Sequence, residues 1–211
     1  MKKFAKSIFL LGGLILCLAA FPVFGQKGSG EFEINRKPLK DFAASVKAKN
    51  IDWTKPFLVE AETVLTRDGR FEQTKFTKTE GDAETVAVVK QAFEAAGESG
   101  WLGYLRRQGI KEIKVSAVQN SENFSVSMVS EQPTPERAKT VSSGMNALVT
   151  LALMADKNGW KKLGDDEIKL LNATKVTAQE KTVNINLSLA AGDFQEMVMR
   201  RVSESKEKTA K

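Results

Sequence analysis

Two stretches of the chain align with each other without a gap: SGWLGYLRRQGIKEIKVSAVQNSENFSVSMV, which begins at Ser99, and NGWKKLGDDEIKLLNATKVTAQEKTVNINLSL, which begins at Asn158. An offset of 59 residues carries Trp101 onto Trp160. The same offset places alternating apolar residues on one another, namely Phe124 on Val183, Val126 on Ile185 and Met128 on Leu187. Alternation of apolar and polar residues is typical of a strand with one buried face. The shared register therefore predicts a repeated structural unit.

The segments that precede these two stretches follow the same offset. It places one apolar stripe of helical spacing on another: Val86 on Met145, Val89 on Leu148 and Phe93 on Ala152. The alternative is convergence, because any two hairpins separated by amphipathic helices align in part. We favour a genuine repeat, since three elements agree in one register.

Three β-hairpins are expected, each followed by a helix. The first joins strands at 57–65 and 70–77 through Asp68-Gly69, a dipeptide that tolerates the backbone angles of a tight turn. The second runs over 113–129 and the third over 170–189. One unit of hairpin and helix cannot bury its sheet face and its helix stripe alone. The sequence therefore predicts an α+β fold of repeated β-hairpin–helix units, with one antiparallel sheet or two and helices packed on one face.

Residues with capping chemistry mark the ends of the expected helices. Asp82 and Thr134 are expected to be N-caps, because their side-chain oxygens can accept hydrogen bonds from the free N–H groups of the first turn. Gly97 is expected to end its helix. Asp193, with the glutamate three residues on, is expected to form a capping box for the last helix. Gly144 lies inside a helix at a cost in stability, which close packing against a neighbouring backbone would explain.

The first 26 residues, MKKFAKSIFLLGGLILCLAAFPVFGQ, have the three parts of a secretory signal peptide: a basic start, an apolar run and small residues before a cleavage site. We expect cleavage after Gly25, which makes 1–25 the signal peptide and the mature protein periplasmic or secreted. The alternative is an uncleaved membrane anchor, for which the apolar run is short unless it extends to Phe24. Lipid attachment at Cys17 is disfavoured, because Leu16 is large where that chemistry needs a small residue.

Removal of this leader lowers the net charge of the chain. The leader holds three of the 32 Lys and Arg residues and none of the 26 acids, so 29 basic residues remain and the net charge falls from +6 to +3. A nucleic-acid-binding protein concentrates basic residues on one face. The basic clusters here, YLRRQGIK and MRRV, are short and flanked by acids. We therefore expect no nucleic-acid partner.

Two missing side chains exclude several chemistries. The chain has no His, and its one Cys lies in the predicted leader. The mature chain therefore has no disulfides, no Cys or His metal site and no His-based triad. We expect no cofactor. The apolar core alone must hold the fold, and about 185 residues are enough for that.

The composition along the chain predicts one folded body with a flexible segment at each end. Residues 26–36 form a Gly- and Ser-containing flexible lead, and the single α+β body covers 37–203. Within the body, 57–129 is one unit, and 130–203 adds a helix, a hairpin and a last helix. Residues 204–211 are charged and are expected to be a disordered tail.

A strand, a D-G turn, a second strand and an amphipathic helix follow one another in VEAETVLTRDGRFEQTKFTKTEGDAETVAVVKQAFEAAGESGW, and IKEIKVSAV adds a further strand. Over residues 57–129, about a third of the chain, this order resembles the C-terminal domain of TonB and TolA proteins. The resemblance implies a small envelope domain that acts by protein contact, often by adding a strand to a partner. It implies no catalysis.

The chain departs from that family in ways that limit the comparison. Its energy-transducing members keep an N-terminal anchor and carry a long Pro-rich spacer, whereas this chain has five prolines in total. An energy-coupling role is therefore not expected. The region from Gln132 to Arg201 lies outside the family pattern.

Candidate catalytic residues are few. Ser142 or Ser143 with Lys139 would make a Ser–Lys pair, although on a helix these are expected to be ordinary surface residues. The acidic run 165–167 lacks the alternating spacing of a calcium loop. We expect no enzymatic activity, and a hydrolase is the third of three hypotheses.

The first hypothesis is a non-catalytic envelope protein that binds an envelope protein partner, through a sheet edge or an apolar groove. The second is a periplasmic carrier that holds an apolar small molecule between sheet and helices, with Trp101, Tyr104 and Trp160 at the mouth. These aromatic residues are the candidate binding residues, and packing in the core is the simpler explanation for them.

Overall fold

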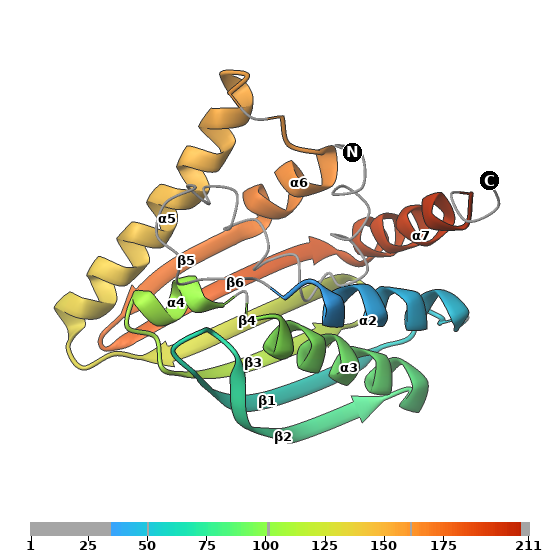
Figure 1. Cartoon of the computed structure of the whole chain (residues 1–211), viewed down its shortest axis with the longest axis horizontal. Helices are drawn as coiled ribbons and strands as arrows, with labels where there is room; N and C mark the ends of the chain where they lie inside the picture. The colour runs from blue at the N-terminus through green and yellow to red at the C-terminus, as the bar shows by residue number, and fades with distance from the viewer. Residues whose placement is uncertain (1–34, 50, 101, 161, 208–211) are drawn as a thin grey trace.

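A computed structural model describes residues 35–49, 51–100, 102–160 and 162–207 (Figure 1). The expected signal peptide and Trp101 lie outside the described residues. Within them the fold is α+β, with one six-stranded antiparallel sheet and six helices. None of the helices in the described ranges is long and apolar enough to cross a membrane.

All three hairpins belong to the same sheet, whose strand order is β2-β1-β3-β4-β6-β5. The strands are β1 (Phe57–Leu65), β2 (Phe71–Gly81), β3 (Glu112–Gln119), β4 (Asn123–Glu131), β5 (Thr174–Gln179) and β6 (Thr182–Ala190). The third hairpin begins at Thr174, so the predicted start at Leu170 was wrong. Leu170 and Leu171 are both buried, which a helix packed on two sides allows and a strand of a sheet covered on one face does not.

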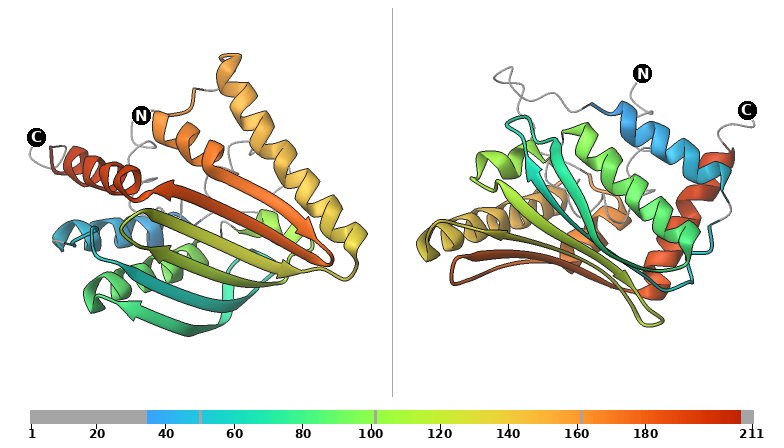
Figure 2. Two further views of the ribbon diagram at one scale, coloured as in Figure 1. Left: turned by 180° about the vertical axis from the view of Figure 1, so that it is seen from behind. Right: turned by 90° about the horizontal axis from the view of Figure 1, so that it is seen from below.

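The helices gather on one side of the sheet (Figure 2). They are α2 (Lys37–Ala48), α3 (Ala83–Ser99), α4 (Gly103–Arg107), α5 (Pro135–Lys157), α6 (Asp165–Ala173) and α7 (Ala191–Glu207). Burial alternates along β1, β3, β4 and β6, as expected for strands covered on one face. The short helices α4 and α6 were not predicted.

The two strands that align in sequence are neighbours in the sheet. β4 pairs antiparallel with β6, with Phe124 opposite Leu189 and Val126 opposite Leu187. Phe124 and Val183 are each 1% exposed and belong to the same core cluster. The two hairpins therefore share one apolar interior.

The chemistry of the helix ends was partly predicted. Asp82 and Thr134 are N-caps: Asp82 Oδ2 accepts from the Thr85 N–H at 3.1 Å, and Thr134 Oγ1 accepts from the Arg137 N–H at 3.2 Å. Gly97 does not end α3, which continues to Ser99.

Three glycine and capping predictions fail for identifiable reasons. Gly97 allows the ring of Phe71 to pack closely against α3, since a Cβ at this position would lie 2.4 Å from Cδ2 of Phe71. The helix ends at Gly100 instead, which has a φ of 69°. No atom of the described part of the chain lies within 4 Å of where a Cβ of Gly144 would be, so no neighbouring backbone in that part explains this glycine. Asp193 lies inside α7, where Oδ1 pairs with Nζ of Lys169 at 2.6 Å.

Candidate functional site

The two edges of the sheet differ in how they are covered. β5 lies beside α5, and Asn146 Nδ2 of that helix donates to the Val176 carbonyl oxygen of β5 at 2.8 Å. Among the residues that the structure describes, β2, at the other edge, pairs only with β1, and nine of its eleven residues are exposed. An edge strand presents unpaired N–H and C=O groups that can pair with another chain. β2 is therefore the candidate binding edge.

The turn that leads into β2 forms where the sequence predicted it. Gly69 has φ of 79°, a conformation that glycine adopts without strain. Its N–H donates to the Thr66 carbonyl oxygen at 3.0 Å, and the Thr66 N–H donates to the Arg70 carbonyl oxygen at 2.9 Å. Gly69 also packs against the backbone of Gly103 at the start of α4, so the tip of the hairpin is in contact with the helix layer.

Two irregularities divide β2 into a bulged half and a regular half. The pairing of β1 with β2 shifts between Glu60 and Ala61 and again between Glu62 and Val64. Gln73 takes a positive φ of 54° near the second shift. Thr63 fixes this bulge, because its hydroxyl donates to the Glu72 carbonyl oxygen at 3.0 Å. Bulges twist an edge and interrupt its hydrogen bonding.

The regular half of β2 is the part suited to strand addition. Lys78, Thr79, Glu80 and Gly81 pair one to one with β1 from Glu60 back to Phe57. The strand is held to α3 further along, where the rings of Phe71 and Phe76 contact that of Phe93 with centroids 4.6 Å and 5.8 Å away. The edge is thus exposed but firmly supported.

The face of the sheet away from the helices carries polar side chains. Ser116 of β3 lies opposite Ser127 of β4, which lies opposite Asn186 of β6. A row of short polar residues therefore crosses three strands. Sequence reasoning did not single out this face as a site, although the polar positions that alternate with buried ones were visible in each strand.

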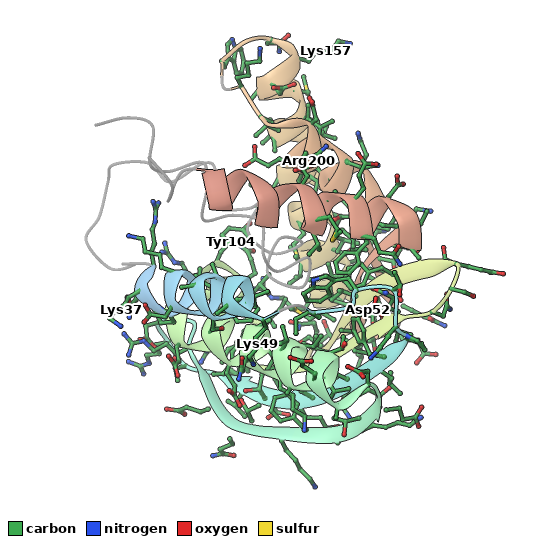
Figure 3. The ribbon with its side chains drawn as sticks, turned by 90° about the vertical axis from the view of Figure 1, so that its right-hand side faces the viewer. Lys37, Lys49, Asp52, Tyr104, Lys157 and Arg200 are labelled. Atoms are coloured by element: carbon green, nitrogen blue, oxygen red, sulfur yellow. The ribbon has the colours of Figure 1, made fainter. Side chains whose placement is uncertain are left out.

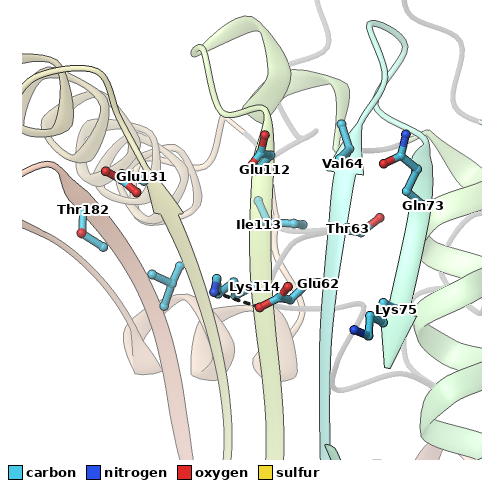
Figure 4. Close-up of a pocket in the computed structure, with 11 residues that line it drawn as sticks. Glu62, Thr63, Val64, Gln73, Lys75, Glu112, Ile113, Lys114, Glu131 and Thr182 are labelled. Carbon is cyan, nitrogen blue, oxygen red and sulfur yellow. Dashed lines mark ion pairs between the residues drawn. The ribbon is translucent and has the colours of Figure 1, made fainter. Parts of the chain in front are cut away.

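A depression of about 490 Å³ lies on this polar face (Figure 4). Its charged lining residues come from four strands: Glu62, Lys75, Glu112, Lys114 and Glu131. Lys114 Nζ lies 2.8 Å from Glu62 Oε1, which lowers the pKa of the Glu62 carboxyl and raises that of the Lys114 ammonium. Both groups are exposed and stay ionised near neutral pH, so this pair is unsuited to proton transfer.

The predicted aromatic residues do not meet at one place. Tyr104 on α4 is half-buried against the core, and burial raises the pKa of its phenol. Trp160 follows the last turn of α5 and is 78% exposed. Figure 3 shows Tyr104 near the middle of the molecule and Lys157, close to Trp160 in sequence, at the far tip of α5. Trp101 lies outside the described residues.

The candidate catalytic groups have structural contacts. Ser142 Oγ donates to the Lys139 carbonyl oxygen at 3.1 Å, within the same helix. Asp166, at the start of α6, is buried and forms an ion pair with Arg200 of α7. In the part of the chain that the structure describes, no group of acids is placed to hold a metal ion.

No family model, no curated protein and no solved structure matches this chain. The resemblance of residues 57–129 to the TonB and TolA C-terminal domain therefore remains a prediction.

Proposed function

We propose that the chain is an exported protein of the cell envelope that binds another protein and catalyses no reaction. The observation that carries the proposal is the exposed edge of β2, which pairs on one side only within the described ranges of the chain. A partner segment in extended conformation would continue the sheet there, with backbone hydrogen bonds to the regular half, Lys78–Gly81. The resemblance to TonB and TolA domains is in accord with this mode of binding.

The N-terminal sequence supports export. A signal peptide over 1–25, cut after Gly25, would release the body into the periplasm or the medium. N-terminal sequencing of the exported chain tests this. A mature chain that begins at Gln26 is expected, whereas a chain that keeps its first residues would support the membrane anchor.

The order of the elements around the β3–β4 and β5–β6 hairpins supports the proposal of a repeated structural unit. Each hairpin follows a long helix and a short one, α3 and α4 in the first case and α5 and α6 in the second. A repeat would account for a sheet that is composed of complete hairpins.

The carrier hypothesis has less support. It needs space between sheet and helices, where the rings of Phe124 and Phe194 stack with centroids 3.8 Å apart and Trp53 meets Phe194 edge-on at 6.0 Å. These rings fill the region in which an apolar ligand would lie near α7. We therefore favour protein binding.

Two photo-crosslinking variants test the proposed function. A photoreactive residue replaces Lys78 on β2 in one and Glu94, an exposed residue of α3, in the other. Irradiation of cells that make the protein is expected to give an adduct of defined mass from the Lys78 position only. No adduct from Lys78, or the same adduct from both positions, would contradict binding at β2.

Proline substitution separates strand addition from other contacts at the same edge. Successive N–H groups of a strand point alternately towards its neighbour and away from it, so one of Lys78→Pro and Thr79→Pro removes an outward N–H. The variant that keeps the melting temperature identifies the outward position. That variant is expected to lose the adduct; if it keeps the adduct, the partner does not add a strand.

A further inference from the structure

The outward face of α5 carries no charge over most of its length. Between Lys139 and Asp156 the helix has no Asp, Glu, Lys or Arg. Leu151 and Met154 are 46% and 49% exposed. A surface helix normally turns charged and polar side chains to water. This face therefore has the character of a contact surface.

The threonines of this face add to its apolar character. Thr140 Oγ1 donates to the Glu136 carbonyl oxygen at 2.9 Å, and Thr150 Oγ1 donates to the Asn146 carbonyl oxygen at 3.0 Å. Each hydroxyl is thus satisfied by the helix that carries it. A partner surface need not supply a hydrogen bond to either residue.

We propose that a second copy of this chain covers the face, in a two-fold dimer in which the two α5 helices pack antiparallel with Ala147 at the axis. Ser143, Ala147, Leu151 and Met154 follow one another at spacings of four, four and three, so they lie along one side of the helix. In the dimer, Ser143 lies opposite the partner's Leu151. Small residues on one helix thus meet large residues on the other.

The same symmetry places unlike charges together at both ends of the contact. Glu136 precedes Ala147 by about 16 Å along the helix axis, and Lys157 follows it by about 15 Å, at about 1.5 Å per residue. Glu136 therefore comes opposite the partner's Lys157, and the pair occurs twice. A lipid surface would offer no such counterpart to an acid at one end and a base at the other. Charge complementarity thus favours a second copy.

The dimer would leave the proposed binding edge free. α5 runs along β5, at the opposite edge of the sheet from β2 (Figure 1). Two β2 edges would therefore be available on one dimer. A contact between two helices is smaller than the roughly 1,200 Å² that stable complexes bury. We accordingly expect a weak dimer that dissociates on dilution.

Analytical ultracentrifugation of the exported full chain tests this proposal. The chain is expected to pass from monomer to dimer as its concentration rises. Ala147→Glu is expected to keep it monomeric, because two carboxylates would meet at the axis. Gln91→Glu, which adds the same charge at an exposed position of α3, is the control and should dimerise like the unmodified chain. A chain that is monomeric throughout, or a dimer indifferent to Ala147→Glu, would overturn the proposal.

Charge reversal tests the antiparallel arrangement. Glu136→Lys and Lys157→Glu are each expected to weaken the dimer about fivefold, since two exposed pairs are lost at once. The double variant should restore the affinity, and its failure to do so would refute this geometry. Vesicles rich in phosphatidylglycerol test whether a lipid surface covers this face instead. If the chain is monomeric and binds these vesicles, and Ala147→Glu abolishes the binding, the face is a membrane-binding surface and the dimer proposal is wrong.

Discussion

The ring of Phe124 in β4 stacks on the ring of Phe194 in α7, with centroids 3.8 Å apart and planes 8° from parallel. This contact joins the centre of the sheet to the last helix. It lies in the same core cluster as Val183 of β6 and Phe57 of β1. The core is therefore continuous from the first hairpin to the last.

Loss of this stacking should destabilise the whole body. Phe194→Ala is expected to lower the free energy of unfolding by about 3–5 kcal/mol, because it removes a buried ring and leaves a cavity. Met199→Ala in the same helix is the control, since Met199 is exposed and its truncation leaves no buried cavity, so it should cost much less than Phe194→Ala. Urea unfolding measures both. Equal effects of the two variants would mean that α7 does not contribute to the core.

The Asp82 carboxylate should make stability depend on pH in the acid range. The hydrogen bond from Lys55 and those from the N–H and hydroxyl of Thr85 lower its pKa from 3.8 to about 2. Because this pKa is lower in the folded chain than in the unfolded chain, the ionised carboxylate stabilises the fold at pH values above the unfolded-state pKa, near 4. This stabilisation is lost as the pH falls to about 2. Asp82→Asn, which keeps a capping oxygen without the charge, should melt below the unmodified chain at pH 5.

The melting-temperature difference between these two proteins is the quantity to follow. It is expected to shrink towards zero between pH 4 and pH 2, as the carboxylate of the unmodified chain is protonated. Asp82→Ala loses the capping oxygen as well as the charge, so its melting temperature should be about 2–4 °C below that of the unmodified chain even at pH 2. A difference that stays constant with pH would show that the charge of Asp82 does not matter.

Two glycines with similar backbone angles should respond very differently to alanine. Gly69 has φ of 79° and Gly159 has φ of 73°, so both substitutions carry a conformational cost of about 1–2 kcal/mol. A Cβ at Gly69 would also lie 2.0 Å from the Gly103 nitrogen, whereas at Gly159 no atom of the described residues lies within 4 Å of a Cβ. Gly69→Ala is therefore expected to cost at least about 3 kcal/mol in chemical denaturation. Similar costs at the two sites would contradict the contact between the hairpin tip and α4.

The side chain of Asn146 should stabilise β5 and slow the amide exchange of this edge strand. Asn146→Ala removes the donor to the Val176 carbonyl oxygen and is expected to destabilise the chain by about 1–2 kcal/mol. Amide exchange in β5 should become faster, while exchange in β1 stays as it was. Asn158→Ala at the C-cap of α5 serves as the control and should leave β5 unchanged. Unaltered exchange in β5 of the Asn146 variant would argue against this role.

Local chemistry could be predicted from the sequence, and distant pairing could not. The caps at Asp82 and Thr134, the turn at Asp68-Gly69 and the α+β class follow from short-range patterns. The order of the strands depends on which hairpins meet, and no local signal shows that β4 pairs with β6. The third hairpin was placed too early because the apolar residues at the end of α6 resemble the start of a strand.

The candidate site was predicted less well than the fold. A sheet edge was named as one route of binding, but nothing in the sequence distinguishes β2 from β5 as the open one. That distinction depends on α5, whose Asn146 reaches the far edge from another part of the chain. The aromatic residues were chosen for their chemistry, and only Tyr104 of the two described ones packs against the core.

The most direct test of the central claim is amide hydrogen exchange of β2 with and without its bound partner, in the complex purified from the envelope. If the partner adds a strand, alternate amides of the regular half, Lys78–Gly81, should exchange more slowly in the complex, since only the outward N–H groups gain an acceptor. Unchanged exchange along β2, or new protection confined to the polar face of the sheet, would contradict the account.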